Sequence, residues 1–290
     1  MKIVLIGADG QLGTDLLEIL KKKQNKDIFP LYFPDFDITK PYEAEKILGN
    51  IKPEIIINTA AYNLVDEAEV KPISPFRINA IAVRDLAVIC RNIGSSLVHF
   101  STDYVFNGEK KSPYIEEDTP KPLSVYGVSK LAGELFIQSI LKKFFIVRTC
   151  GLYGVAGCWG KGTNFVDAMI SKERKGDELK VVNDQWITPT STWELAGKIG
   201  ELCEKDFYGI YHLTNEGYCT WFEFAVAIFS LLKIDSKILP VASESFSSIA
   251  RRPAYSVLEN KKAKKNGITG FSDWKDALRG YLKRKGHIRA

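Results

Sequence analysis

Paired cysteines, long apolar runs and internal repeats are all missing from this sequence. The five cysteines form no Cys-x-x-Cys pair and are odd in number, so we expect neither a disulfide scaffold nor a zinc site. They are Cys90, Cys150, Cys158, Cys203 and Cys219. No stretch reaches the roughly 18 apolar residues that a membrane-spanning helix needs, and the apolar run in MKIVLIGADG is too short for a secretory signal. We therefore expect a soluble, reduced, cytoplasmic protein that has no membrane partner.

The overall balance is that of an ordinary globular protein. Of the 290 residues, 45% are hydrophobic and 26% are charged, which suits one large domain or a domain with a smaller annex. The net charge of +5 comes largely from lysines and arginines near the C-terminus. Because these lack interleaved aromatic residues or a known motif, we interpret them as a solvated surface and expect no nucleic-acid partner. An anionic substrate could still use one or two of them.

The N-terminal segment predicts a nucleotide-binding turn. A strand is expected over residues 2–6 and an amphipathic helix over 11–23. Gly7 and Gly10 lie between the two, and Gly13 lies at the start of the helix. Glycines at these places let the backbone turn tightly and approach a pyrophosphate, which then sits on the helix N-terminus. The spacing is G-x-x-G-x-x-G rather than G-x-G-x-x-G. A plain glycine-rich turn is the alternative.

The second strand, expected over residues 28–33, contains Pro30, so we expect it to be short or irregular. In folds that select NAD, an acidic residue ends this strand and binds the ribose 2′-hydroxyl. Here Tyr32 and Phe33 stand at that place, so the sequence neither repels NADP nor selects NAD. If the register differs by two or three positions, Asp35 supplies the missing carboxylate.

Small residues follow the third strand, which is expected over residues 54–60. Ala60 and Ala61 would let a flat cofactor lie against the backbone. Asp37 either accepts a hydrogen bond from an adenine amino group or caps the helix that begins at Pro41, and the residues alone leave both readings open. A mostly buried helix over 79–94 then leads to a fourth strand at 96–101.

Thr102, Tyr126 and Lys130 are the candidate catalytic residues. Thr102 ends an apolar run typical of a buried parallel strand, and open α/β sheets bind their ligands at that end. Tyr126 and Lys130 are four residues apart in a helical segment and share a face, and a neighbouring cation lowers the pKa of a phenol. The same Tyr-x-x-x-Lys spacing begins at Tyr42 and Tyr281, which we expect on solvated helix faces.

The alternation of strands and helices through residue 149 predicts an α/β protein with a doubly wound, Rossmann-like parallel sheet. We expect a dinucleotide-binding domain over residues 1–150, to which segments between about 178 and 215 return. These segments are strands at 179–184 and 210–214 and a helix at 191–205. Residues 151–177 and 216–290 are expected to form a smaller C-terminal substrate-binding lobe, which begins with a glycine-rich loop and contains helices at 221–232 and 273–284.

A set of short segments, taken together and in order, carries a resemblance to a known family. The segments are GADGQLG, DIT, NTAAY, STDYVFNG, VYGVSKLAGE, VVNDQ, PTST, GIYHLTNEG and RRPAYSVLEN. This set resembles the extended short-chain dehydrogenase/reductases, and within them the dTDP-4-dehydrorhamnose reductase family. The similarity runs from Met1 to about Leu282. Single motifs are shared with many sugar-nucleotide enzymes, but the full set is specific.

The resemblance implies NAD(P)H-dependent reduction of the C4 ketone of a nucleotide-linked 6-deoxy-4-keto sugar, with dTDP-L-rhamnose as the expected product. Thr102, Tyr126 and Lys130 match the family's catalytic triad. The implied cofactor is NADP(H) or NAD(H), with NADPH slightly favoured. The implied cofactor-binding residues are Gly7, Gly10, Gln11, Leu12, Gly13, Asp37, Ile38, Ala60, Ala61, Tyr62, Tyr126 and Lys130. The implied substrate-binding residues are Thr102, Asp103, Tyr104 and Asn164. Arg251 and Arg252 are candidates for the substrate diphosphate, because guanidinium groups fit phosphate oxygens, with surface solvation as the alternative.

Two departures from the family pattern bear on the substrate. Sugar-nucleotide 4,6-dehydratases carry Thr-Asp-Glu where this chain has Thr102-Asp103-Tyr104, so dehydration is disfavoured. Many rhamnose-pathway reductases have Arg-Thr-Ser-Trp where this chain has residues 148–151, RTCG, so an aromatic contact to the sugar is lost. Tyr153 or Trp159 could replace that contact, although either is more often a packing residue.

The remaining expectations concern metal, assembly and rival functions. Asp15 and Glu194 lie where some family members hold magnesium at a dimer interface, so magnesium is possible but not predicted. We expect a monomer or a homodimer that binds a nucleotide sugar. The rival functions are a non-catalytic dinucleotide-binding regulatory subunit, like that of methionine adenosyltransferase, and a sugar-nucleotide epimerase.

Overall fold

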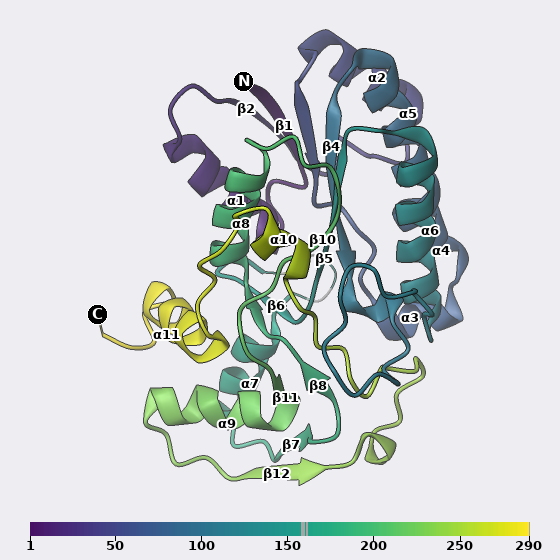
Figure 1. Ribbon diagram of the computed structural model, residues 1–290. Helices are drawn as coiled ribbons and strands as arrows, with labels where there is room; N and C mark the ends of the chain where they lie inside the picture. Colours follow the sequence, from purple (N-terminus) through teal and green to yellow (C-terminus); the bar gives the residue numbers. More distant parts are fainter. Residues whose placement is uncertain (158–159, 161, 290) are drawn as a thin grey trace.

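A six-stranded parallel sheet forms the centre of the computed structural model, which describes residues 1–157, 160 and 162–289 (Figure 1). The strands are β1 Lys2–Ile6, β2 Asp27–Leu31, β3 Ile55–Asn58, β4 Ser96–Thr102, β5 Phe144–Thr149 and β10 Gly209–His212. Their order is β10-β5-β4-β3-β1-β2, and every neighbouring pair is parallel. The predicted doubly wound sheet is therefore confirmed. The chain proceeds in opposite directions from β1, so β1 and β3 flank the place where such sheets bind ligands.

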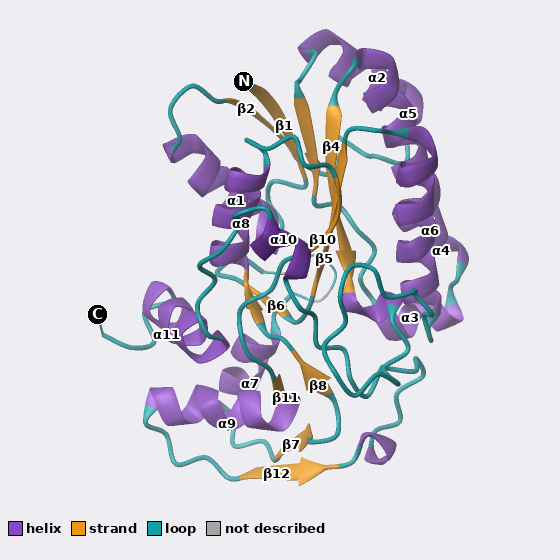
Figure 2. Cartoon of the chain, viewed as in Figure 1, coloured by secondary structure: helices purple, strands orange, loops and turns teal. Residues whose placement is uncertain are grey.

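Helices cover both faces of this sheet (Figures 1 and 2). One face carries α1 Gln11–Lys22 and α8 Thr192–Leu202, and the other carries α2 Pro41–Ile51, α5 Ala82–Ile93 and α6 Val125–Ile140. In β1, Ile3 and Leu5 join the core beneath α1 and α8, while Val4 and Ile6 join the core on the opposite face. Because both faces are buried, the central strands are mostly apolar rather than alternating, although β4 also buries polar residues such as His99.

The strand β2 forms one edge of the sheet and has 5 residues, as many as β1, so Pro30 does not make it shorter than its neighbours. Pro30 is tolerated there because one side of an edge strand has no ladder partner to satisfy. The strand ends at Leu31, whose carbonyl oxygen accepts hydrogen bonds from the backbone N–H groups of Gly7 at 2.9 Å and Ala8 at 3.2 Å. These bonds tie the glycine turn to the end of β2.

A second group of elements packs beyond the carboxyl ends of the sheet strands (Figure 1). It contains α7 Phe165–Arg174, β7 Leu179–Val182, α9 Trp221–Leu232, β12 Ile238–Val241 and α11 Trp274–Arg284. Their apolar side chains form a core of their own that includes Phe224, Ile228 and Leu278. The helices predicted at 221–232 and 273–284 are thus confirmed within about one residue.

The prediction that residues 179–184 return to the central sheet was wrong. The strand β7 forms there, but it pairs in parallel with β12 in a separate two-stranded sheet. Leu179 and Val181 are buried against α7 and α9 while Lys180 is exposed, so β7 has only one apolar face. A strand with one apolar face does not suit the interior of a sheet that is covered on both sides. The other two predicted segments do return, as α8 and β10.

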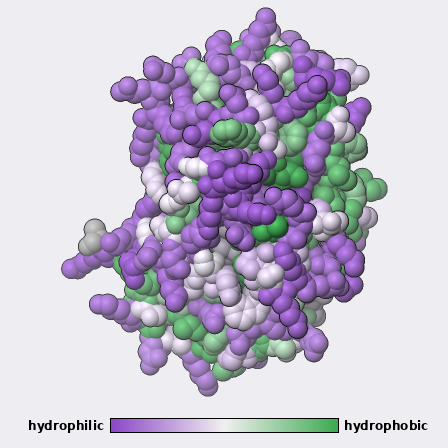
Figure 3. All heavy atoms as spheres, viewed as in Figure 1, coloured by the Kyte–Doolittle hydropathy of each residue, from purple (hydrophilic) through white to green (hydrophobic). Residues whose placement is uncertain are grey.

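Short elements complete the described chain. They are α3 Val65–Val70, α4 Ile73–Phe76, the π-helix η1 Arg77–Ile81, the 3₁₀ helix η2 Asp103–Val105, β6 Leu152–Tyr153, β8 Trp186–Ile187, β9 Thr190–Ser191, β11 Cys219–Thr220, the 3₁₀ helix η3 Ser243–Ser245 and α10 Lys261–Lys265. None of the helices formed by the described residues is long and apolar enough to cross a membrane. The face in Figure 3 is mostly hydrophilic, with apolar side chains gathered along the edge formed by α4 and α6.

Candidate active site

A cavity of about 680 Å³ opens at the carboxyl ends of β1, β3, β4 and β5, between the sheet and the second group of elements. Its walls come from the glycine turn, from the segments after β2, β3 and β4, from α6 and from the loop after β5. The predicted site residues that line it are Gly7, Gly10, Gln11, Leu12, Asp37, Ile38, Ala60, Ala61, Thr102, Asp103, Tyr104, Tyr126, Lys130 and Asn164. The fold thus brings most of the predicted cofactor and catalytic residues into one hollow.

The glycine turn has the geometry that its spacing predicted. Gly7 has a positive φ of 73°, and a Cβ there would lie 2.7 Å from Thr59 Oγ1. A Cβ on Gly13 would lie 2.0 Å from the carbonyl oxygen of Gly7, so this glycine holds the turn against α1 rather than lining the cavity. Gly10 is the N-cap residue of α1, and no side chain accepts a capping hydrogen bond there. The first turn of α1 contains no acidic residue. The free amides and dipole at this end of a helix suit a pyrophosphate.

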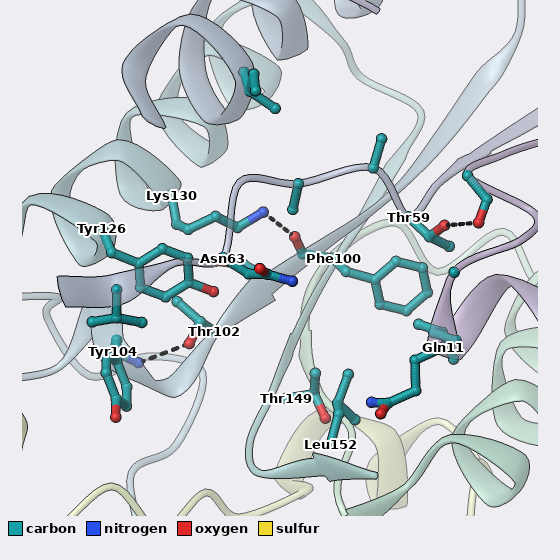
Figure 4. Close-up of a pocket in the computed structure, with 18 of the residues that line it drawn as sticks. Gln11, Thr59, Asn63, Phe100, Thr102, Tyr104, Tyr126, Lys130, Thr149 and Leu152 are labelled. Carbon is teal, nitrogen blue, oxygen red and sulfur yellow. Dashed lines mark hydrogen bonds between the residues drawn. The ribbon is translucent and has the colours of Figure 1, made fainter. Parts of the chain in front are cut away.

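Buried polar atoms without a protein partner point into the same cavity. Gln11 Oε1, Ser101 Oγ and Thr149 Oγ1 are buried and make no hydrogen bond among the described residues, yet all three residues line the cavity. Figure 4 shows the side-chain amide of Gln11 directed toward Leu152 and Thr149. Because buried polar atoms are almost always paired, these residues fit a ligand with several hydrogen-bonding groups, such as a dinucleotide.

The segment after β2 forms one end of the cavity. Phe33, Phe36, Asp37, Ile38 and Thr39 line it. Asp37 Oδ1 accepts hydrogen bonds from Thr39 N and Thr39 Oγ1, both at 2.8 Å, whereas the N-cap of α2 is Lys40 and has no side-chain cap. The alternative that Asp37 caps α2 was therefore wrong. Instead it holds a local turn, a common role for Asp ahead of a helix. Asp35 is exposed and lies outside the lining, so a register slip does not bring it to the cavity.

Thr102 and Tyr126 reach the cavity from neighbouring elements. Thr102 is the last residue of β4; its Oγ1 donates to Asp103 Oδ1 at 3.0 Å and accepts from Tyr104 N at 3.2 Å. Ser124 caps α6 by accepting a hydrogen bond from Gly127 N, which starts the helix so that Tyr126 lies in its first turn. Figure 4 shows the phenol of Tyr126 directed into the cavity, on the side where Thr102 stands.

Lys130 lies one helical turn beyond Tyr126 and is buried, with only 2% of its surface exposed. Its Nζ donates to the carbonyl oxygen of Phe100 at 2.6 Å and lies 3.3 Å from His99 Nε2. Burial lowers the pKa of Lys130 to about 8, and the carboxylate of Glu134 opposes that shift. Lys130 therefore remains an ammonium at neutral pH, although only by a small margin.

Sequence reasoning missed the residues behind Lys130. His99 is buried, its pKa is held well below the usual value by burial and by Lys130, and its Nδ1 lies 3.2 Å from Asn58 Nδ2. Asn58 Oδ1 in turn accepts a hydrogen bond from Ala60 N at 3.1 Å. The signal in the sequence was a histidine and an asparagine inside runs that are otherwise apolar, because such residues need buried partners.

The wall after β5 contains Cys150 and lacks the aromatic residue that the family pattern has at residue 151. Cys150 Sγ lies 3.1 Å from Asp103 Oδ2, and burial raises the pKa of both the thiol and the carboxyl group. Tyr153 does not line the cavity. Its buried ring packs against that of Phe224, with 5.5 Å between the ring centroids. Trp159 and Cys158 lie outside the described residues. Another aromatic residue, Trp221, lines the cavity and was not predicted, because its helix is distant in the sequence.

Several predicted residues are engaged elsewhere. Tyr62 lies outside the lining, with its backbone bonded to Asn79. Arg251 is exposed, and Arg252 forms a bidentate pair with Asp66 at 3.2 and 2.7 Å. Asn164 lines the cavity, but its side chain caps α7 through Asp167 N at 3.0 Å.

Tyr42 and Tyr281, which begin the two other Tyr-x-x-x-Lys segments, were both expected on solvated helix faces, and only Tyr42 lies on one. Tyr42 is 87% exposed, as expected. Tyr281 is only 3% exposed, and its hydroxyl donates to Asp167 Oδ1 at 2.6 Å, so the expectation of a solvated face was wrong. Its ring fills the core between α7, α9 and α11, which the local helical pattern could not reveal.

The two acids considered for magnesium have protein partners. Asp15 is buried and accepts hydrogen bonds from Thr192 Oγ1 and, at 3.0 Å, from Arg284. Glu194 Oε2 accepts from Asn215 Nδ2 at 2.8 Å and from Ser272 N at 2.9 Å. Within residues 1–157, 160 and 162–289, no group of three or more His, Cys, Asp or Glu residues is placed to hold a metal ion.

The chain is similar to known proteins over almost its full length. The family model described as RmlD substrate binding domain matches residues 1–286. The chain is 37% identical to the spore coat polysaccharide biosynthesis protein SpsK of Bacillus subtilis, with 98% of each chain covered. It is 34% identical to the dTDP-4-dehydrorhamnose reductase of Escherichia coli, with 97% of each covered.

Solved structures give the same result. A dTDP-4-dehydrorhamnose reductase from Clostridium acetobutylicum superposes with a TM-score of 0.93 and 41% identity, covering 98% of this chain and 99% of that one. A dTDP-4-dehydrorhamnose reductase from Bacillus anthracis, in complex with NADP, superposes with a TM-score of 0.92 and 39% identity over the same shares. A UDP-glucose 4-epimerase from Thermotoga maritima has a TM-score of 0.85 but 16% identity, so it shares the fold alone.

Proposed function

This chain belongs to the family described as RmlD substrate binding domain, and on that premise we propose that it is a dTDP-4-dehydrorhamnose reductase. It is an oxidoreductase that reduces the C4 ketone of a nucleotide-linked 6-deoxy-4-keto sugar with a nicotinamide cofactor, converting dTDP-4-dehydro-L-rhamnose to dTDP-L-rhamnose. The observation that carries this proposal is the presence of Thr102, Tyr126 and Lys130 in one cavity with the glycine turn.

We propose the following division of roles. The bound reduced nicotinamide supplies a hydride to the C4 carbon of the sugar. As the C=O π bond opens onto oxygen, the hydroxyl of Tyr126 gives its proton to that oxygen, and the alcohol forms. Thr102 orients the same oxygen by donating a hydrogen bond, which requires its hydroxyl to turn away from Asp103. The ammonium of Lys130 stabilises the negative charge left on Tyr126, and the phenol regains its proton from solvent.

The cofactor end of the cavity has a role in the same proposal. Gln11 and Leu12, at the start of α1, are proposed to hold the pyrophosphate, and Asp37 and Ile38 are proposed to contact the adenine. Ala60 and Ala61, which line the cavity, are proposed to flank the path toward the nicotinamide. Ser101 and Thr149 are additional candidates, because their hydroxyls are buried in the lining without a partner among the described residues.

The substrate side is proposed more broadly. Asp103, Tyr104 and Asn164 line the cavity beside Thr102 and are proposed to contact the sugar. Arg251 and Arg252 remain candidates for the diphosphate. Arg251 is the first to test, because the guanidinium of Arg252 is already paired with Asp66.

Other parts of the proposal concern organisation and setting. We propose that residues 1–150, with the returning segments, bind the dinucleotide and that residues 151–177 and 216–290 bind the substrate. A monomer or homodimer and a reducing, cytoplasmic setting remain proposals; the buried, free state of the four described cysteines supports the latter. The sequence slightly favoured NADPH, and the NADP-bound relative supports that preference.

One assay separates this function from its rivals. Purified protein is mixed with the reduced cofactor and dTDP-4-dehydro-L-rhamnose, and the absorbance of the reduced nicotinamide is followed. A reductase consumes cofactor in proportion to product. An epimerase releases product without net consumption, and a regulatory subunit binds cofactor without turnover. Either of these two results would reject the reductase.

A pair of variants ties the activity to the site. Tyr126→Phe is expected to lower kcat by about 10²–10⁴-fold, because it removes the proton donor, while cofactor binding measured by fluorescence titration stays nearly intact. Tyr42→Phe is the matched control, since Tyr42 has the same spacing to a lysine but is 87% exposed on α2. Normal turnover by Tyr126→Phe would remove Tyr126 from its proposed role.

A further inference from the structure

We propose that Trp221 forms an apolar wall against the sugar of the substrate. There it makes the site select a 6-deoxy sugar, whose C6 is a methyl group, over the same sugar with a hydroxyl on C6. This inference rests on the proposed function, because it takes the substrate to be a nucleotide-linked 6-deoxy-4-keto sugar. It adds a residue that decides which sugar is bound and gives that residue no catalytic step.

Trp221 is the first residue of α9, and no other residue of that fully described helix lines the cavity. A capping box fixes the start of the helix. Thr220 Oγ1 accepts a hydrogen bond from Glu223 N at 3.1 Å, and Glu223 Oε2 accepts one from Thr220 N at 2.8 Å. The indole packs against the ring of Phe165, with 4.6 Å between the ring centroids. A side chain held in this way loses little conformational freedom when a ligand packs against it.

Contacts connect Trp221 to the catalytic end of the cavity. Its side chain packs against the apolar cluster that contains Cys150 and Ile187, and both of these residues also line the cavity. Cys150 Sγ lies 3.1 Å from Asp103 Oδ2, and Asp103 Oδ1 accepts a hydrogen bond from Thr102 Oγ1 at 3.0 Å. Trp221 is therefore linked through this cluster to the hydroxyl that is proposed to orient the ketone oxygen.

The covalent structure of the substrate identifies the group that meets Trp221. The ketone carbon is C4, and C6 is joined to it through C5 alone, so C6 lies close to Thr102 whenever the ketone does. The nucleotide base is separated from the sugar by the whole diphosphate. A side chain linked to Thr102 through one cluster is therefore placed to contact the C5–C6 edge of the sugar rather than the base.

The wall around Trp221 is apolar and uncharged. In the described lining, no charged side chain follows Lys130 in the sequence, and Phe165 adds a second aromatic ring beside the indole. Gly151 also lines this wall but is strained by any side chain. Its φ is 55°, and a Cβ there would lie 3.3 Å from Pro189 Cα. Trp221 is therefore the largest side chain of the wall.

A methyl group and a hydroxyl group respond differently to such a wall. The methyl group gains by leaving water for an apolar surface, whereas a buried hydroxyl group loses its hydrogen bonds to water. The polar residues that accompany Trp221 are already engaged: Asn164 Nδ2 donates to Gly154 O at 3.0 Å, and Thr163 Oγ1 donates to Asn164 O at 3.4 Å. The expected preference for the 6-deoxy sugar is on the order of 10–100-fold.

Binding of product analogues tests this without a catalytic step. The full chain, with NADP⁺ present, is titrated in a calorimeter with dTDP-L-rhamnose and with dTDP-L-mannose, which differ only by the hydroxyl on C6. The 6-deoxy compound is expected to bind about 10–100-fold more tightly. A third titration uses dTDP, which carries the base and the diphosphate without the sugar.

Variants of Trp221 locate the effect. Trp221→Ala is expected to weaken binding of dTDP-L-rhamnose by roughly tenfold and to remove most of the preference, whereas Trp221→Phe, which keeps an aromatic ring, should retain part of it. Affinity for the cofactor and for dTDP should stay unchanged in both. Trp193→Ala is the matched control, because Trp193 is also partly buried in the first turn of a helix, α8, but lies outside the lining, against Lys22 and Arg284.

Each outcome bears on the inference or on the proposed function. Equal affinities for the two sugar nucleotides in the unaltered protein would overturn the inference and leave the reductase intact. A preference that survives Trp221→Ala, or a loss of affinity for dTDP as large as that for dTDP-L-rhamnose, would overturn it too. If Trp221→Ala also loses cofactor affinity, Trp221→Phe decides, and an unchanged ratio there would count against the inference. Binding of neither sugar nucleotide, together with no oxidation of reduced cofactor, would instead reject the proposed function.

Discussion

Replacing Glu134 by glutamine is expected to cost this protein about 3–5 kcal/mol of its free energy of unfolding. Glu134 on α6 and Arg148 on β5 form a bidentate pair at 3.0 and 2.6 Å, with side chains 0% and 2% exposed. Arg148 also lies over the ring of Phe106, with its guanidinium carbon 5.2 Å from the ring centroid, and its Nη1 is buried without a partner among the described residues. Removing the carboxylate would leave a buried guanidinium without its counter-charge.

The expected change in melting temperature follows from chain length. Unfolding entropy is about 2.1 cal/mol/K per residue, which for 290 residues is on the order of 0.6 kcal/mol/K. A loss of 3–5 kcal/mol then lowers Tm by roughly 5–8 °C. Calorimetry of the apo protein measures this shift, and urea unfolding checks the free energy independently.

Two further variants make the test decisive. Glu178→Gln removes a carboxylate that also lies 2.6 Å from its partner Lys180, but both side chains are more than half exposed, so the loss should be under about 1 kcal/mol. The double variant Glu134→Leu with Arg148→Met should recover most of the stability, since no buried charge remains. A Glu134→Gln loss as small as that of Glu178→Gln would refute the argument from burial.

The remaining predictions probe the site itself. Activity should fall as pH rises through about 8, because Lys130, whose pKa burial lowers, then loses its proton. In Glu134→Gln this fall in activity should occur at lower pH, since the carboxylate of Glu134 raises the pKa of Lys130. A kcat/KM profile that stays flat across this range would contradict the proposed role of Lys130. Gly13→Ala should weaken cofactor binding and lower the free energy of unfolding by about 1–3 kcal/mol, because its Cβ would lie 2.0 Å from the carbonyl oxygen of Gly7. Gly197→Ala is the control in the middle of α8, where a Cβ has no atom within 4 Å, and it should be neutral or stabilising. Equal losses of stability in differential scanning calorimetry would argue against crowding at Gly13. Thr102→Val should lower kcat while leaving cofactor affinity unchanged, and a titration showing lost affinity instead would point to a structural role for the hydroxyl.

Local patterns in the sequence determined the frame of the molecule. Continuous apolar runs predicted the buried parallel strands, because strands covered on both faces have no polar side. The spacing of Gly7, Gly10 and Gly13 predicted the turn, since it reflects backbone geometry over a few residues. Tyr126 and Lys130 could be placed together because helical spacing is also local.

Only the tertiary structure decided what depends on pairing between distant segments. The residues of β7 do not by themselves show whether the strand pairs with the central sheet or with β12; their one local signal is a single exposed polar position, Lys180. The same holds for Tyr281, which helical spacing placed on a surface and packing placed in a core. It holds too for Arg252, whose guanidinium meets Asp66 from a distant part of the chain. Short-range periodicity is fixed by the geometry of strands and helices, whereas burial, charge pairing and the pKa of Lys130 are set by neighbours that only the folded chain brings together.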